Sequence, residues 1–346
     1  MSKKATSLSD LGLYGLIEHF QKQYKALTPA ELPALEEDAS AILETPELLN
    51  STSMMLEGIN FDLTYTPLQH LGYKAVTVAT NDLLAMNATP IQISVNIGLS
   101  NKITLEMLET LMSGITAACQ QHNIKLTGFK PAASLTGLTI AVNVVGKENK
   151  KGLIRRSNAQ PTDVICVTGD LGGALMGLHL LEREKRVLKS NDHSQPVFGD
   201  NEYVLKRQLK PEPRTTLLST LEELDIVPTS MTGISEGLAT SLILLCRSSK
   251  TGCRLYENKI PLHQSTLKAA KELNFNPLVA ALNGGEDYEL IFTLPLKVYE
   301  ANQARLPEFI TAVGYITEKD KACRMITNAD DEIELKARGW GNLIDK

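Results

Sequence analysis

The most informative stretch of the chain is Asn-Gly-Gly-Glu-Asp-Tyr-Glu-Leu-Ile-Phe, at residues 283–292. Its two glycines permit a tight turn, and residues 288–293 alternate in the way that is typical of a strand. Two acids, Glu286 and Asp287, separate the turn from the strand. This order of features is too particular for a generic loop, so it indicates a specific protein family.

Length and composition predict two domains in a soluble globular protein. The chain has 346 residues, more than one hydrophobic core usually organises. Its net charge of −5 argues against a nucleic-acid or anionic-membrane partner, because both attract a basic surface. No export signal or run long enough to cross a bilayer is found, so a cytoplasmic protein outside the membrane is expected.

Cysteine usage fits a reducing compartment. The chain has five cysteines, an odd number that are scattered and never spaced as CxxC. This spacing suggests neither a disulfide framework nor a zinc cluster. The cysteines are Cys119, Cys166, Cys246, Cys253 and Cys323.

Apolar spacing predicts helices and strands mixed throughout the first half of the chain. The expected helices are 11–23, 71–86 and 105–122, and the expected strand regions are 54–65, 91–99 and 136–145. A charged, glycine-bounded run at 146–152 is typical of a domain boundary. We therefore expect an N-terminal domain over 1–148 and a C-terminal α/β domain over 149–346.

The second half has the same mixed pattern. Strands are expected at 163–167, 253–256 and 288–293, and helices at 171–184, 203–208, 235–246 and 265–273. Mixed helices and strands in both halves predict an α/β or α+β fold.

Asp82 is the strongest candidate for a functional acid from the residues alone. Its carboxylate lies near an apolar stripe at helical spacing. A buried carboxylate is usually paired, hydrogen-bonded or metal-bound. A position on the polar edge of the stripe, hydrogen-bonded to a neighbouring helix, is an equally open alternative. The stripe is Ala75, Val78, Ala79 and Met86.

Two other segments carry acids. Glu36, Glu37 and Asp38 precede the first strand, where carboxylates could bind a hard cation such as magnesium, although an acidic turn is more often simply solvated. Ser235 and Glu236 open an expected helix, as its N-cap and first-turn acid. No Walker phosphate loop is present in the sequence.

Together with Leu-Glu-Gly-Ile-Asn-Phe at 56–61 and the helix-like segment 74–86, the stretch 283–292 resembles the thiamine-monophosphate kinase family of the aminoimidazole-ribonucleotide-synthetase-like superfamily. The resemblance runs from residues 11–17 to Trp340. It implies two domains, with N-terminal domains pairing as a homodimer across a β-barrel-like interface and the active site between domains. It also implies magnesium-dependent phosphoryl transfer from ATP to thiamine monophosphate, giving thiamine diphosphate and ADP.

The resemblance assigns ligand-binding roles by position and assigns no residue a catalytic role. Its metal positions correspond to Asp38, Asp82, Thr52 and Glu236. Its nucleotide positions correspond to Lys130, Arg156 and Ser235, and its substrate positions to Asn60, Glu286 and Trp340.

Several acids of the family pattern are replaced in this chain. Ser53, Lys130 and Gly233 stand where the family has aspartates, and Glu236 is longer than the family aspartate. We therefore expect weak magnesium binding or fewer ions, with low or absent activity. The alternative is a catalytically impaired homologue, a possible pseudoenzyme, that acts as a dimeric small-molecule or protein-binding protein.

Overall fold

The computed structural model describes most of the chain. The described residues are 15–17, 19, 37–42, 45–190, 198–319 and 322–337. Most of the helix expected over 11–23 and the whole of Trp340 lie outside them. None of the described helices is both long and apolar enough to cross a bilayer.

The first sheet has five strands in the order β1-β2-β5-β3-β4. Strands β3 and β4 are parallel, and the other neighbours are antiparallel. The sheet is open, with β1 and β4 as its edges, so the described chain does not itself form the expected barrel. The strands are β1 (Ser40–Ile42), β2 (Thr45–Leu56), β3 (Ala88–Leu99), β4 (Lys125–Ala133) and β5 (Thr139–Glu148).

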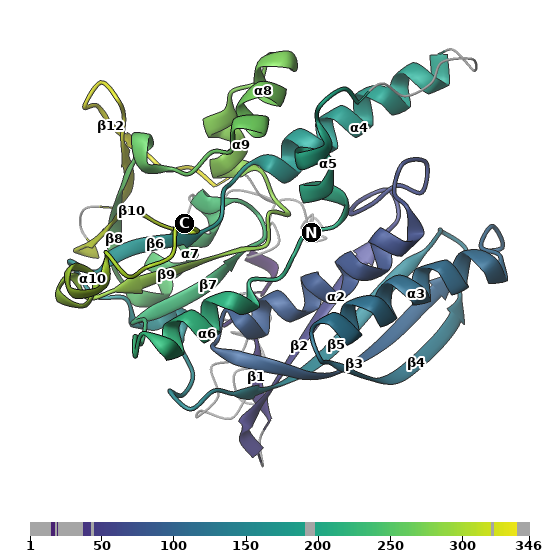
Figure 1. The fold of residues 1–346 in the computed structure, drawn as a ribbon, viewed down its shortest axis with the longest axis horizontal. Coiled ribbons are helices and arrows are strands. Elements are labelled where there is room, and N and C mark those ends of the chain that lie inside the picture. The colour runs from purple at the N-terminus through teal and green to yellow at the C-terminus, as the bar shows by residue number, and fades with distance from the viewer. Residues whose placement is uncertain are drawn as a thin grey trace, which may run out of the picture.

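Two helices, α2 (Leu68–Leu84) and α3 (Leu105–Gln121), lie side by side across one face of this sheet (Figure 1). The glycine at position 72 permits their close approach. A Cβ at this position would overlap the carbonyl oxygen of Leu111 in α3. The apolar side chains between helices and sheet form one core, which fixes α2 firmly against the strands.

The second sheet has seven strands in the order β12-β11-β8-β10-β6-β9-β7. Its neighbours are antiparallel except for the parallel pair β8 and β11. The strands are β6 (Val164–Thr168), β7 (Ser230–Ile234), β8 (Gly252–Tyr256), β9 (Glu289–Leu294), β10 (Ile310–Thr317), β11 (Cys323–Ile326) and β12 (Glu332–Glu334).

Helices cover both faces of the second sheet. One core joins α7 (Leu238–Ser249) and α9 (Pro277–Asn283) to one face, and another joins α6 (Thr215–Glu223) and α10 (Leu296–Asn302) to the other. The end of α2 contributes to the second of these cores through Leu84. The remaining long helices form a separate cluster beside the sheet, and α5 of this cluster contacts α2. They are α4 (Gly173–Ser190), α5 (Glu202–Leu209) and α8 (Gln264–Glu272).

The expected mixed α/β class is confirmed. The helices expected over 71–86 and 105–122 correspond to α2 and α3. Strand β5 ends at Glu148, where the boundary was placed, and the division into two domains stays a prediction.

Candidate active site

The stretch 283–292 forms a turn that is anchored to the connection between β7 and α7. The backbone N–H of Glu286 donates to the carbonyl of Ser235 at 2.8 Å, and that of Tyr288 donates to Ile234 at 3.1 Å. A Cβ on Gly285 would lie 2.8 Å from the same Ser235 carbonyl oxygen, so a larger residue would push the two segments apart.

Ser235 does not cap a helix, so this prediction is wrong. Helix α7 begins at Leu238, its N-cap is Gly237, and its described first turn contains no acid. The chain turns at Gly237 with φ +98°, a conformation that favours glycine. Ser235 is therefore left exposed and Glu236 half-buried at the surface of this turn.

Glu286 joins the two halves of the molecule. Its Oε2 atom accepts hydrogen bonds from Lys74 Nζ at 2.7 Å and Gln208 Nε2 at 2.8 Å. The Lys74 side chain, on α2, is only 2% exposed and also donates to the Gln208 carbonyl at 2.9 Å. A buried ammonium needs such partners, so Glu286 is held at a fixed position between α2 and α5.

A cavity of about 340 Å³ opens beside Glu286. Asn60 and Glu286 line it together, which brings two of the expected substrate-binding residues to one place. The lining also includes Leu175, Leu178 and the ion pair between Lys185 and Asp62. Apolar and charged walls suit a small molecule that combines a ring with ionic groups.

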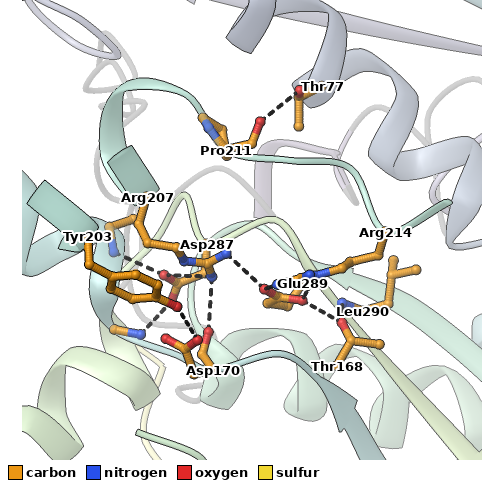
Figure 2. A network of polar contacts seen from close by, with 12 residues as sticks. Thr77, Thr168, Asp170, Tyr203, Arg207, Pro211, Arg214, Asp287, Glu289 and Leu290 are labelled. Atoms are coloured by element: carbon orange, nitrogen blue, oxygen red, sulfur yellow. Dashed lines mark hydrogen bonds and ion pairs between the residues drawn. The ribbon is translucent and has the colours of Figure 1, made fainter. Parts of the chain in front are cut away.

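The other two acids of the stretch 283–292 face the protein interior (Figure 2). Asp287 accepts from the backbone N–H groups of Gly172 and Ala174, at 2.6 and 3.1 Å, at the start of α4. Burial raises the pKa of Asp287 to about 6, although Arg207 and these N–H groups act in the opposite direction.

Glu289 is completely buried and fully partnered. Its carboxylate accepts from Thr168 Oγ1 at 2.6 Å, pairs with Arg207 Nη1 at 2.9 Å, and also binds the guanidinium of Arg214 (Figure 2). Asp287 and Glu289 therefore hold the fold together, and Glu286 is the acid of this stretch that lines the cavity.

Asp38 belongs to a second group of polar side chains, outside the lining of this cavity. Its Oδ1 atom accepts from Arg156 Nη2 at 2.6 Å and from Thr232 Oγ1 at 3.1 Å. Its Oδ2 atom is buried and has no hydrogen-bond partner among the described residues. Neighbouring Glu37 accepts from the backbone N–H of Arg156 at 2.8 Å, and burial raises its pKa.

Asp82 is close enough to Asp38 for the two charges to interact. Burial, helped by the charge of Asp38, raises the pKa of Asp82 to about 7, although a hydrogen bond from Ser51 Oγ at 2.7 Å and the charge of Arg156 act in the opposite direction. Two neighbouring carboxylates with a free oxygen fit a hard cation such as magnesium, which prefers oxygen ligands. The structure thus brings Asp38, Asp82 and Arg156 together, as the resemblance implies.

Asn81 was not found by sequence reasoning. Its side chain is 1% exposed, and neither atom of its amide is hydrogen-bonded within the part of the chain that the structure describes. A Cβ on Gly233 would overlap its Nδ2 atom. The amide therefore occupies the space that a side chain at position 233 would need, next to Asp82 in the sequence.

Tyr288 is close to carboxylates of both groups. Burial raises its pKa well above the usual value, and the charges of Glu286, Asp82 and Glu236 raise it further. The charges of these three carboxylates therefore all act on one buried phenol, although only Glu286 among them lines the cavity.

Thr52 and Lys130 lie apart from this site within one chain. Thr52 is exposed and alternates with buried Ser51 on β2, so it points to the face of the first sheet opposite α2. Lys130 is exposed on edge strand β4, in register with Asn96. Their assignment to metal and nucleotide stays a prediction.

Comparisons with known proteins identify the family of this chain. The model of the family "AIR synthase related protein, N-terminal domain" matches residues 36–147. Thiamine-monophosphate kinase of Buchnera aphidicola subsp. Schizaphis graminum is 30% identical over 96% of this chain and 98% of its own. The corresponding Synechococcus elongatus protein is 32% identical, covering 90% and 91%.

Solved structures show the same fold. The thiamine monophosphate kinase from Aquifex aeolicus is 24% identical, with a TM-score of 0.76 over 95% of this chain and all of its own. A structure described as AaThiL complexed with AMPPCP and TMP has a TM-score of 0.80 at 23% identity, covering 98% and 99%. On the full-length identity to its curated relatives, the chain belongs to the thiamine-monophosphate kinase family.

Proposed function

We propose that this chain transfers a phosphoryl group from ATP to thiamine monophosphate, in a reaction that needs magnesium and gives thiamine diphosphate and ADP. The observation that carries the proposal is that Glu286, which lines the cavity with Asn60, and Asp82 are both close enough to the buried phenol of Tyr288 for their charges to act on it. Full-length identity of about 30% to thiamine-monophosphate kinases supports the same reaction.

Asp38 and Asp82 are the residues that would hold magnesium, since one oxygen of Asp38 has no partner among the described residues and the two carboxylates repel each other without a cation. A bound magnesium ion neutralises phosphate charge and orients the transferred group. Arg156, which pairs with Asp38, would contact the phosphates of the nucleotide. Phosphoryl transfer needs little more from the protein than positioning and electrostatic stabilisation.

The proposed rate is lower than that of a kinase with the full aspartate set. Gly233 offers no carboxylate, and Lys130 carries the opposite charge from the family aspartate. Fewer anionic ligands imply weaker magnesium binding or fewer ions. The same substitutions support the second candidate, a homologue that binds the ligands without turnover.

The test is to incubate the full-length protein with ATP, magnesium and thiamine monophosphate and to measure thiamine diphosphate and ADP by chromatography. Product should require all three components and should disappear on chelation of magnesium. Glu286→Gln should raise KM for thiamine monophosphate, because it weakens the contact with Lys74 at the cavity. Exposed Glu300→Gln on α10 is the matched control and should leave KM unchanged.

The outcomes separate the two candidates. Calorimetric binding of ATP and thiamine monophosphate without product would reject the kinase and favour the binding homologue. Absence of binding with and without magnesium would reject both.

A homodimer is the second part of the proposal. On the face of the first sheet opposite α2, Met54 is 61% exposed and Leu56 is 39% exposed. Apolar side chains on a sheet face are stabilised when another surface covers them, and the resemblance implies that the N-terminal domains pair as a homodimer. Light scattering should give twice the chain mass, and Met54→Lys should lower it. A monomeric wild-type protein at micromolar concentration would reject the dimer.

A further inference from the structure

Three cysteines that are far apart in the sequence meet on the second sheet. Cys246 comes from α7, Cys253 from β8 and Cys323 from β11, and their three sulfur atoms all lie within 4.8 Å of one another. The parallel pairing of β8 and β11 places Cys253 directly opposite Cys323, and α7 packs over this pair. Their position is set by three elements of the fold and not by one flexible loop.

The three thiols have different access to solvent. Cys246 and Cys253 are buried in the aliphatic core between α7 and the sheet, whereas Cys323 is half-buried. All five cysteines of the chain are free thiols. Cys323 therefore offers a route by which a small ion could reach the two buried sulfurs.

The sulfur positions match the size of a metal–thiolate centre. Zinc–sulfur bonds are about 2.3 Å long, so sulfurs that share one ion lie roughly 3.8 to 4.0 Å apart. Side chains whose sulfurs are already within 4.8 Å need to move by less than about 1 Å to reach this spacing.

We propose that Cys246, Cys253 and Cys323 bind one thiophilic d10 cation, Zn²⁺ or Cu⁺, through their three sulfur atoms. Each thiol gives its proton to solvent as a metal–sulfur bond forms, and no electron is transferred. Zn²⁺ completes a tetrahedron with one solvent molecule on the side of Cys323, whereas Cu⁺ is satisfied by the three thiolates. Cysteine spacing in the sequence did not indicate this cluster.

The ion would act as a clamp between α7 and the strands β8 and β11. These strands lie toward the opposite edge of the sheet from β7, which contributes to the candidate active site. Cys246 also lies near the last turn of α7, far along the helix from the Gly237 end. Binding should therefore raise the stability of the protein without being required for phosphoryl transfer.

The experiment uses the full-length chain, reduced and freed of metal by chelation. Co²⁺ is added as a probe, because cobalt–thiolate bonds give a charge-transfer absorption that oxygen or nitrogen ligands do not. We expect saturation at about one ion per chain, displacement of Co²⁺ by Zn²⁺ and a rise in melting temperature on loading. A parallel titration with Cu⁺ against a chromogenic chelator shows which of the two ions the site prefers.

Two matched variants give the control. Cys323→Ala removes the half-buried ligand and is tolerated by the core, so it should abolish saturable binding and the melting shift. Cys119→Ala removes a buried thiol from the core of the first sheet. It should change neither the saturable metal binding nor the rise in melting temperature on loading. Absence of the charge-transfer band in reduced wild-type protein overturns the proposal. So does equal metal uptake by Cys323→Ala, or an oxidised pair among the three cysteines that persists after reduction.

Discussion

Two groups of buried carboxylates in this protein differ in how well they are satisfied. Glu289 binds two guanidinium groups and the hydroxyl of Thr168, with no surface exposed. Asp38 leaves one buried oxygen without a described partner, and Asp82 has a pKa of about 7. The first group behaves like part of the core, and the second resembles a site prepared for a ligand.

The difference explains which acids should be sensitive to substitution and in which assay. A buried charge with a full set of partners stabilises its surroundings, and removing it leaves those partners unpaired. A carboxylate without a full set of partners costs stability and is retained where a ligand needs it. Stability and ligand binding should therefore respond in opposite ways at the two groups.

The largest expected effect is at Glu289. Glu289→Gln removes the charge shared by Arg207 and Arg214 and should lower the free energy of unfolding by about 3–5 kcal/mol. Urea unfolding measures this change. Glu332→Gln, which breaks more exposed pairs with Arg254 and Arg324, is the control and should lower the free energy of unfolding far less than Glu289→Gln does. Equal losses in the two variants would contradict the comparison.

The next effect tests the space beside Asp82. Gly233→Asp restores a family carboxylate but forces its Cβ into Asn81, so it should destabilise the protein by about 1–3 kcal/mol. Asn81→Ser in the same chain should recover most of that loss and strengthen magnesium binding. The free energy of unfolding and the magnesium affinity of the single and double variants give the coupling energy between positions 233 and 81. Additive effects would show that the two positions do not compete for space.

Asp82 gives the third prediction, through pH. The folded pKa of about 7 lies above the unfolded value of 3.8, so the folded protein holds a proton that the unfolded chain has lost. The free energy of unfolding should therefore fall as pH rises from about 4 to about 7. Asp82→Asn should reduce this fall and raise stability at pH 8 by roughly 1–2 kcal/mol, discounted because the side chain is partly exposed.

The control for this prediction is Asp287, whose pKa of about 6 contributes a similar fall over a narrower range. The Asp82→Asn protein should keep that contribution. Asp82 would not be the group with the strongly raised pKa if the free energy of unfolding of the Asp82→Asn protein no longer depended on pH between 4 and 7. The same conclusion would follow if this protein were less stable than the wild type at pH 8.

The smallest effect separates two neighbouring positions on β2. Ser51→Ala removes the hydrogen bond to Asp82 and should change magnesium affinity several-fold, with a stability change of about 1 kcal/mol. Thr52→Ala, on the opposite face, should change stability by less than about 0.5 kcal/mol. A loss of magnesium binding in Thr52→Ala alone would instead support the role that the resemblance gives to Thr52.

Elements with a strong local pattern could be predicted from the sequence, as α2 and α3 show. Strand β4 was missed because nearly all of its residues are exposed, so it lacks the alternation of a half-buried strand. Strand β7 was missed for the opposite reason, since all five of its residues are buried.

The site was predictable where a motif carried it and not where only the fold assembles it. Asn60 and Glu286 came from short motifs and line one cavity. The sequence could not indicate that Lys74 is the partner of Glu286, because local patterns contain no information on a contact across 212 positions. Asn81 has no motif of its own, and its role depends on the absent side chain at Gly233.

The ion pair between Lys74 and Glu286 also constrains the order of events during synthesis. At about 5–20 residues per second, roughly 10–40 s separate the appearance of these two residues at the ribosome. During that interval α2 can pack on its own sheet, but the Lys74 ammonium has no Glu286 to bind. We therefore expect the Lys74 ammonium to stay hydrated until Glu286 has been synthesised, so that closure of the site is a late folding step.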